Sequence, residues 1–218
     1  MPFTGGRNTR GIVTLVVSTS APGTDTTGGR MDFETARFNM VEQQIRTWDV
    51  LDQRVLDLLF EVPREDFVPE EYRTLAFADT QIPLADGQVM MPPREEARAL
   101  QMLGLEGNEH VLEIGTGSGY LTALLARAAR RVTSVEISQT LHEQAGEKLK
   151  AADISNADLI CGDGVSGWPK EAPYDAIVVT GSVPRLEPHF QRQLKPGGRL
   201  FVVVGDAPAM EALLIRRV

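Results

Sequence analysis

The sequence predicts an α/β fold in which helices cover both faces of a mostly parallel, doubly wound sheet. Short apolar runs alternate with amphipathic segments between residues 111 and 204, which is typical of repeated strand–helix units. A turn with three glycines follows the first of these runs, and polar residues end several others. Ligands of such sheets bind beyond the carboxyl ends of the strands, so we expect a site there.

The central segment is residues 111–120, VLEIGTGSGY, an apolar run followed by glycines at alternate positions. The residues after it are apolar at helical spacing and predict a helix: Leu121, Leu124, Leu125 and Ala128. Glycine reaches positive φ without strain and allows the backbone to approach a ligand, while the helix start offers free N–H groups. The binding candidates in this turn are Gly115, Thr116, Gly117 and Gly119.

Two carboxylates accompany this turn and indicate the kind of ligand. The G-x-G-x-G spacing differs from the dinucleotide fingerprint and from the phosphate loop. Glu113, just before the first glycine, would repel a pyrophosphate but suits a cationic ligand such as S-adenosylmethionine, which carries an ammonium and a sulfonium. Glu136, in the next apolar run at residues 132–137, is placed to accept hydrogen bonds from two ribose hydroxyls.

Composition sets further bounds on a chain of 218 residues, enough for one sizeable domain with extensions. The net charge of −8 argues against a nucleic-acid partner and against anionic membranes. A single cysteine, Cys161, excludes an intrachain disulfide and favours a reducing, cytoplasmic compartment; we expect it to be buried in its strand. No Cys/His cluster has zinc spacing, so we expect no metal, and we expect a monomer or weak dimer.

Residues 1–30 are rich in Gly, Thr and Ser and predict a disordered extension. A secretory signal is the alternative, because Arg7 and Arg10 precede a short apolar run at residues 11–17. That run is short for a signal and no clear cleavage site follows it, so we favour the extension, with Met31 as a candidate start.

Residues 31–103 predict a helical subdomain that carries a substrate loop. Helices are expected over residues 33–46, from Leu51 to Val62 before Pro63, and over residues 95–103. Between the second and third of these helices, residues 78–94 contain three prolines and one glycine that predict an irregular segment: Pro83, Gly87, Pro92 and Pro93. A long loop ahead of a ligand-binding strand is often functional.

Residues 104–218 predict the ligand-binding core. After the first strand we expect strands at residues 132–137, 158–161, 174–180 and 200–204, with helices at 139–151, begun by Ser138, and at 187–194. Residues at the strand ends should converge on one crevice: Gly115, Glu136, Asp163, Gly164, Thr180 and Ser182.

The last segment, residues 211–218, predicts a further strand. Sheets of this type close with an antiparallel strand beside it, and its absence would leave an exposed edge. We therefore expect either a truncated sequence or a partner that covers the edge.

From about Met40 to Gly205 the sequence resembles the protein-L-isoaspartate O-methyltransferase family of class I S-adenosylmethionine-dependent methyltransferases. The glycine turn is shared with the whole class, whereas the N-terminal helices and the loop at residues 67–69 are more specific. The matching stretches are residues 40–46, 54–56, 62–64, 67–69, 87–88, 111–120, 162–164, 167–169, 174–177 and 194–198.

The resemblance implies a Rossmann-like class I methyltransferase fold and an enzyme of protein repair. Members transfer a methyl group from S-adenosylmethionine to an isoaspartyl carboxylate in a damaged protein or peptide. Carried over by position, the three glycines of the turn would hold the methionine part of the cofactor. Glu136 would hold the ribose, and Asp163 with Gly164 would flank the adenine.

One segment departs from the family pattern. After Gly-Gln the family has Thr-Ile-Ser-x-Pro-His or Tyr, and its serine is regarded as the active-site residue. Here residues 89–94 read VMMPPR, so Met91 occupies the serine position and Arg94 the His/Tyr position. An acceptor carboxylate is already ionised at neutral pH and needs no general base. Arg94 is a candidate clamp for that carboxylate, and Met91 is a candidate packing surface for an apolar acceptor.

Two alternatives follow from this departure. A divergent methyltransferase of the same fold would act on a small acid or another small molecule. A non-catalytic module would bind the cofactor and recognise a partner without turnover. The glycine spacing argues against a dehydrogenase.

Overall fold

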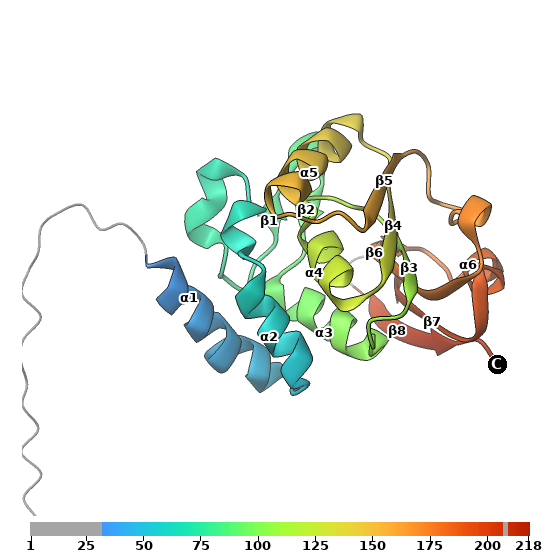
Figure 1. Cartoon of the computed structure of the whole chain (residues 1–218), viewed down its shortest axis with the longest axis horizontal. Coiled ribbons are helices and arrows are strands. Elements are labelled where there is room, and N and C mark those ends of the chain that lie inside the picture. The colour runs from blue at the N-terminus through green and yellow to red at the C-terminus, as the bar shows by residue number, and fades with distance from the viewer. Residues whose placement is uncertain (1–31, 207–208) are drawn as a thin grey trace, which may run out of the picture. The chain divides into compact units, whose positions relative to one another are not determined.

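The computed structural model describes residues 32–206 and 209–218 (Figure 1). The extension expected in residues 1–30 lies outside the described residues. The described chain from residue 32 onward forms one compact unit that contains both the predicted helical subdomain and the predicted core. In this part of the chain, no helix is long and apolar enough to cross a bilayer.

A six-stranded sheet confirms the predicted fold class. Its spatial order is β5-β4-β3-β6-β7-β8, and every neighbouring pair is parallel except β7 and β8. The strand order reverses direction between β3 and β6, so the carboxyl ends of these two strands form the switch point where a ligand fits. The strands are β3 (His110–Ile114), β4 (Arg131–Glu136), β5 (Ala157–Cys161), β6 (Tyr174–Val183), β7 (Leu194–Val204) and β8 (Glu211–Arg216).

Each face of the sheet has its own hydrophobic cluster. Along β6, Ala176 and Val178 join the larger cluster, whereas Ile177 and Val179 join the smaller one, because successive side chains of a strand point to opposite faces. Helices α3 (Pro93–Leu103), α4 (Tyr120–Ala128) and α5 (Gln139–Ala151) contribute to the larger cluster, and α6 (Pro188–Arg192) contributes Phe190 to the smaller one. This arrangement matches the prediction of helices on both faces.

The N-terminal helices are present with one local difference. Helix α1 (Phe33–Asn39) continues as a π-helical turn over Met40–Ile45 and a 3-10 turn over Arg46–Trp48. Helix α2 (Gln53–Glu61) ends before Pro63, as expected. The π-helical turn holds Met40, Val41 and Ile45 in the core, and apolar spacing alone does not distinguish it from an α-helical turn.

The segment between α2 and α3 is irregular, as predicted, and contains a short hairpin. Strands β1 (Ile82–Pro83) and β2 (Val89–Met90) pair antiparallel around the 3-10 turn Ala85–Gly87. Two further 3-10 turns, Arg64–Asp66 and Glu70–Leu75, precede it. Helix α3 begins at Pro93, two residues before the expected start, because proline fits the first helical position.

Two expectations about the sheet need correction. The predicted last strand is present as β8, but it is itself the antiparallel strand that we expected beside it, and it pairs with β7 along Arg199–Val204. Cys161 is exposed and not buried, because it ends β5, the strand at the opposite edge of the sheet. An edge strand has a neighbour on one side only, so its side chains are less covered.

The predicted helix after the glycine turn gives a test of the core. Leu124 is fully buried in α4, so Leu124→Ala should lower the free energy of unfolding by about 3 kcal/mol through lost burial and the cavity left behind. Leu51 is 65% exposed, and Leu51→Ala should change it by less than about 0.5 kcal/mol. Urea unfolding followed by circular dichroism measures both; equal effects would contradict the packing described.

Candidate functional site

A crevice of about 510 Å³ lies at the carboxyl ends of β3, β4 and β6. It brings together seven of the residues singled out from the sequence, which come from five separate segments: Met91, Gly115, Gly117, Glu136, Asp163, Gly164 and Thr180. Ser182, beside Thr180, also lines it. The carboxyl ends of parallel strands therefore converge as expected for this class of sheet.

The glycine turn is held close against β6. Gly115 has φ +94, and a Cβ built there would lie 2.3 Å from the hydroxyl oxygen of Thr180. That hydroxyl is within 3.0 Å of the Ile114 carbonyl and 2.8 Å of the Gly115 carbonyl, so it can donate to either. Only glycine satisfies both the positive φ and the close approach, and the backbone is thereby left open to the crevice.

Glu136 is the buried carboxylate of the crevice. Its two oxygens accept hydrogen bonds from the backbone N–H groups of Gly117 and Ser138, each at 2.9 Å. The side chain therefore ties the glycine turn to the end of β4 and the start of α5. A carboxylate has about four acceptor sites, so capacity remains for ligand hydroxyls.

Glu113 lies behind the glycine turn and does not line the crevice. It is fully buried, and one oxygen accepts hydrogen bonds from the hydroxyls of Thr122 at 2.5 Å and Ser134 at 2.6 Å. Ser134 also contacts Thr116, which places Thr116 in the same buried network. The other carboxylate oxygen has no hydrogen-bond partner among the described residues. Burial raises the pKa of Glu113 to about 7, and the two hydroxyls only partly oppose this.

Gly164 and Gly119 are required by packing. A Cβ at Gly164 would lie 2.9 Å from the Ile114 side chain at the end of β3, so glycine lets this loop form a wall of the crevice. Asp163, beside it, accepts a hydrogen bond from the backbone of Val165 at 2.9 Å. Gly119 lies outside the crevice lining; a Cβ there would be 3.2 Å from that of Ala145, so it serves the contact between α4 and α5.

Met91 and Arg94 lie in different places. Met91 lines the crevice, and its carbonyl oxygen accepts a hydrogen bond from Arg64 at 2.7 Å. Arg94, in the first turn of α3, forms an ion pair with Asp79, and its guanidinium lies 4.4 Å from the ring centroid of Trp48. It is absent from the crevice lining, so the structure gives the carboxylate-clamp hypothesis no support.

The sequence missed several crevice residues, including Gln81, Gln88 and Glu95. Gln81 and Gln88 belong to the segment predicted as the substrate loop and Glu95 to the start of α3, but no local pattern identifies which of these side chains reach the crevice. Burial raises the pKa of Glu95. Among the described residues that line the crevice, none is Lys, Arg or His.

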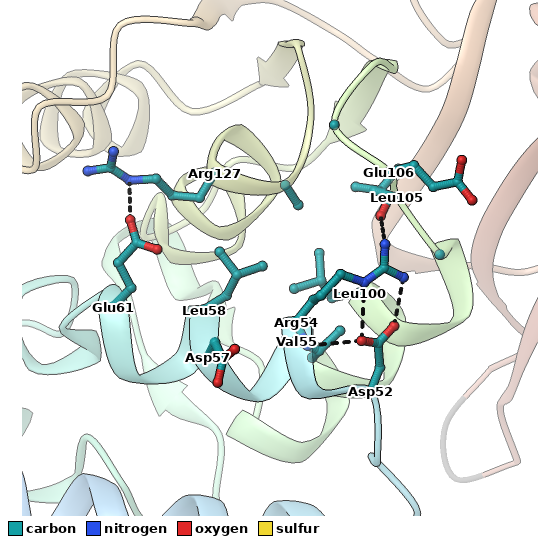
Figure 2. A pocket seen from close by; sticks show the side chains of 13 residues that line it. Asp52, Arg54, Val55, Asp57, Leu58, Glu61, Leu100, Leu105, Glu106 and Arg127 are labelled. Atoms are coloured by element: carbon teal, nitrogen blue, oxygen red, sulfur yellow. Dashed lines mark hydrogen bonds and ion pairs between the residues drawn. The ribbon is translucent and has the colours of Figure 1, made fainter.

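A second cavity, of about 360 Å³, lies between α2, the end of α3 and α4 (Figure 2). Its floor is apolar, with Val55, Leu58 and Leu100. Its two arginines are paired at the rim, Arg54 with Asp52 and Arg127 with Glu61. It contains none of the predicted site residues and is not the candidate site.

The sheet order, the glycine turn and the buried acid at the end of the second strand together define a class I methyltransferase fold. The family model for protein-L-isoaspartate(D-aspartate) O-methyltransferase matches residues 35–217. The chain belongs to this family, which confirms the resemblance seen in the sequence.

Individual relatives agree with this assignment. Protein-L-isoaspartate O-methyltransferase 2 of Shewanella sediminis is 41% identical over 87% of this chain and 78% of its own length. Protein-L-isoaspartate O-methyltransferase 1 of Syntrophobacter fumaroxidans is 42% identical over 85% of this chain and 86% of its own.

Solved structures agree on the fold. A protein-L-isoaspartate O-methyltransferase superposes with a TM-score of 0.73 at 29% identity, over 83% of this chain and 60% of that one. A protein from Plasmodium falciparum, described as a putative member in complex with S-adenosyl-L-homocysteine, gives a TM-score of 0.70 at 19% identity, over 86% of this chain and 91% of that one.

The buried Glu113 gives a pH-dependent prediction for the ligand-free protein. Its pKa is about 7 when folded and near 4.5 when unfolded, so between these values the unfolded chain is ionised while the folded chain still holds the proton. The contribution of Glu113 to the free energy of unfolding should therefore fall as the pH rises from about 4.5 to 7, by about 3 kcal/mol, and then level off.

Glu113→Gln removes this titration. Urea unfolding of both proteins from pH 4.5 to 8 should show that the difference between native protein and variant changes across this window. Parallel curves would contradict a raised pKa at Glu113.

Proposed function

We propose that this protein transfers a methyl group from S-adenosylmethionine to the carboxylate of isoaspartyl residues in damaged proteins or peptides. The observation that carries the proposal is the family match over residues 35–217 together with a crevice that has the glycine turn and Glu136 at its centre. Relatives at about 40% identity bear the name of this activity.

The crevice fits the cofactor on two structural grounds. Cβ atoms at Gly115 and Gly164 would collide with Thr180 and Ile114, so backbone, not side chains, forms these walls. The buried acid Glu136 lies between them and keeps acceptor capacity. We assign the methionine part to the glycine turn, the ribose to Glu136 and the adenine to the loop of Asp163 and Gly164.

When bound, the cofactor supplies an electrophilic methyl group on a positively charged sulfonium. The acceptor carboxylate is ionised at neutral pH, so the protein has no proton to remove. Methyl transfer cancels the opposite charges of the two reactants. Because the described crevice lining carries no cationic side chain, it leaves the acceptor charge uncompensated. The protein's contribution to the rate is therefore the alignment of the carboxylate with the methyl group.

The family pattern has a serine where this chain has Met91, and that serine could contact the acceptor. Ser182 is our candidate for this polar contact in this chain. Met91 offers a thioether surface and no hydrogen-bond donor. The Thr180 hydroxyl is occupied by the carbonyls of Ile114 and Gly115. Ser182 lines the same crevice and is exposed, so its hydroxyl is available to the acceptor.

We also propose a cytoplasmic location and a monomer or weak dimer. We also propose that the protein has no nucleic-acid or membrane partner, in line with the net charge of −8.

Labelled methyl transfer to an isoaspartyl peptide, beside the same peptide with normal aspartate, tests the function. We expect label on the isoaspartyl peptide alone. Calorimetry on the same preparation measures cofactor binding. Tight binding with no label on either peptide would reject the proposed acceptor and favour a small acid or a non-catalytic role.

Gly115→Ala tests the assignment of the methionine site. The added Cβ would meet Thr180 at 2.3 Å and displace the turn, so the Kd for S-adenosylmethionine should rise at least about tenfold, or 1.4 kcal/mol. Gly107→Ala is the control, because Gly107 has a similar φ of +98 but nothing within 4 Å of the added atom. The control should bind within about twofold of the native protein. Unchanged binding by Gly115→Ala would overturn the assignment.

A further inference from the structure

Arg64 is a fully buried arginine between α2 and the hairpin. In the sequence it is far from every residue of the predicted site. Each of the three guanidinium nitrogens has a polar partner. Nε donates to the carbonyl of Ala76 at 2.8 Å, and Nη2 donates to the carbonyl of Met91 at 2.7 Å. Nη1 forms an ion pair with Glu96 of α3. The planar group also lies 4.8 Å from the ring centroid of Tyr120.

These partners connect the two halves of the crevice. Ala76 and Met91 bound the segment that carries the hairpin, and this segment contributes Gln81, Gln88 and Val89 to the crevice lining. Tyr120 is the first residue of α4, directly after the glycine turn. One side chain therefore joins the base of the hairpin to the element that follows the turn.

We propose that Arg64 is a positioning residue that sets the acceptor side of the crevice, including Met91, at its working distance from the glycine turn. The proposal rests on the proposed function, because it assigns the hairpin side to the acceptor and the turn side to the cofactor. Arg64 does not line the crevice and acts only through the backbone carbonyls that it holds.

The cost of burying this charge supports a positioning role over simple packing. Burial lowers the pKa of Arg64 to about 10, so it remains charged at neutral pH. Replacement of a buried ion pair by apolar residues of similar volume is often neutral or stabilising, so stability alone does not require an arginine here. The planar fork of Arg64 donates at once to two carbonyls from positions 15 residues apart, Ala76 and Met91, and so fixes their separation.

The tip of the hairpin has a different and weaker attachment. Asp86 accepts a hydrogen bond from the hydroxyl of Ser138, and this contact is exposed. Ser138 is the N-cap of α5, and its backbone N–H also donates to Glu136. The hairpin is thus attached at two places. Arg64 holds its base through buried contacts, and Ser138 holds its tip through an exposed contact.

A double variant, Arg64→Met with Glu96→Leu, separates position from stability. It removes the buried ion pair as a unit, so no uncompensated charge is left inside. The carbonyls of Ala76 and Met91 lose their donor, so we expect a lower melting temperature, and kcat is compared well below it. We expect a Kd for S-adenosylmethionine within about twofold of the native value. We expect kcat for methylation of an isoaspartyl peptide to fall at least about tenfold, because small displacements of a reacting group cost rate steeply.

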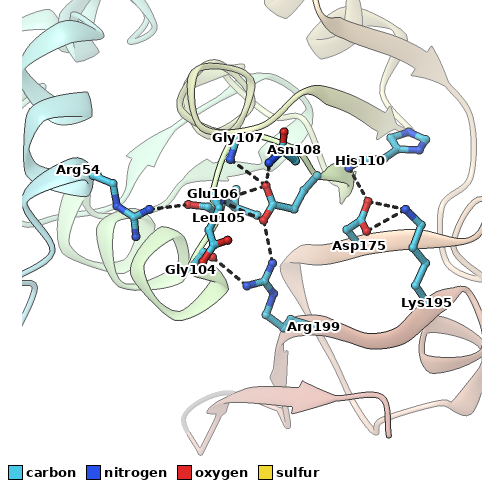
Figure 3. Close-up of polar contacts among 11 residues, drawn as sticks. Arg54, Gly104, Leu105, Glu106, Gly107, Asn108, His110, Asp175, Lys195 and Arg199 are labelled. Atoms are coloured by element: carbon cyan, nitrogen blue, oxygen red, sulfur yellow. Dashed lines mark hydrogen bonds and ion pairs between the residues drawn. The ribbon is translucent and has the colours of Figure 1, made fainter.

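Arg64→Lys is the second variant, and Arg199→Lys is its matched control. Lysine keeps the charge of Arg64 but replaces the fork with one nitrogen, which cannot reach both carbonyls and Glu96 together. Arg199 is only partly buried but makes the same kinds of contact at the opposite end of the sheet, where it donates to the carbonyl of Gly104 at 2.8 Å and pairs with Glu109 at 3.2 Å (Figure 3). We expect kcat to fall in Arg64→Lys and to stay within about twofold in Arg199→Lys.

Hydrogen exchange gives a readout that does not depend on the reaction. Amides of residues 77–91 should exchange faster in both Arg64 variants, while those of residues 111–119 keep their native rates. If the native protein transfers no labelled methyl to an isoaspartyl peptide, the proposed function fails. The hydrogen-exchange rates then test on their own whether Arg64 positions the hairpin. Native rates in residues 77–91 of the double variant would overturn the proposal, as would an equal loss of kcat in Arg199→Lys.

Discussion

The two hydrogen bonds that Glu136 accepts from the backbone of Gly117 and Ser138 are the interaction on which the site depends. They fix the glycine turn to the end of β4, so the loops after β3 and β4 form one surface. The Thr180 hydroxyl fixes the same turn to β6 from the other side. The turn is thereby held between its two neighbouring strands, and its backbone is organised before any ligand arrives, which lowers the entropy lost on binding.

Charge in the crevice is distributed to suit a cationic ligand. Glu95, Glu136 and Asp163 line it, and its described lining has no basic side chain. Such a site attracts a sulfonium and offers no cationic side chain to a free carboxylate. In the proposed function, selectivity for the acceptor therefore comes from shape and from neutral hydrogen bonds, for which the hairpin segment and Ser182 are our candidates.

Periodicity and turn chemistry were enough to predict the sheet, the glycine turn and the N-cap at Ser138, because these are set by neighbouring residues. Neighbouring residues did not predict three other features: the side of the strand that Glu113 faces, the exposure of Cys161, and the pairing of Arg94 with Asp79. They depend on strand order and on helices distant in sequence. Arg64 shows the same limit, since its four partners lie between 12 and 56 positions away.

The crevice has two walls of different chemical make-up. Where Gly115, Gly117 and Gly164 lie, the wall is backbone, and any side chain there collides or strains the chain. Across from it, Gln81, Gln88, Met91 and Glu95 present side chains from a segment that takes no part in the sheet. The first wall excludes side chains, whereas the second is made of them. If the second wall meets the acceptor, as we propose, side-chain changes there can alter the acceptor without altering the backbone that faces the methyl donor.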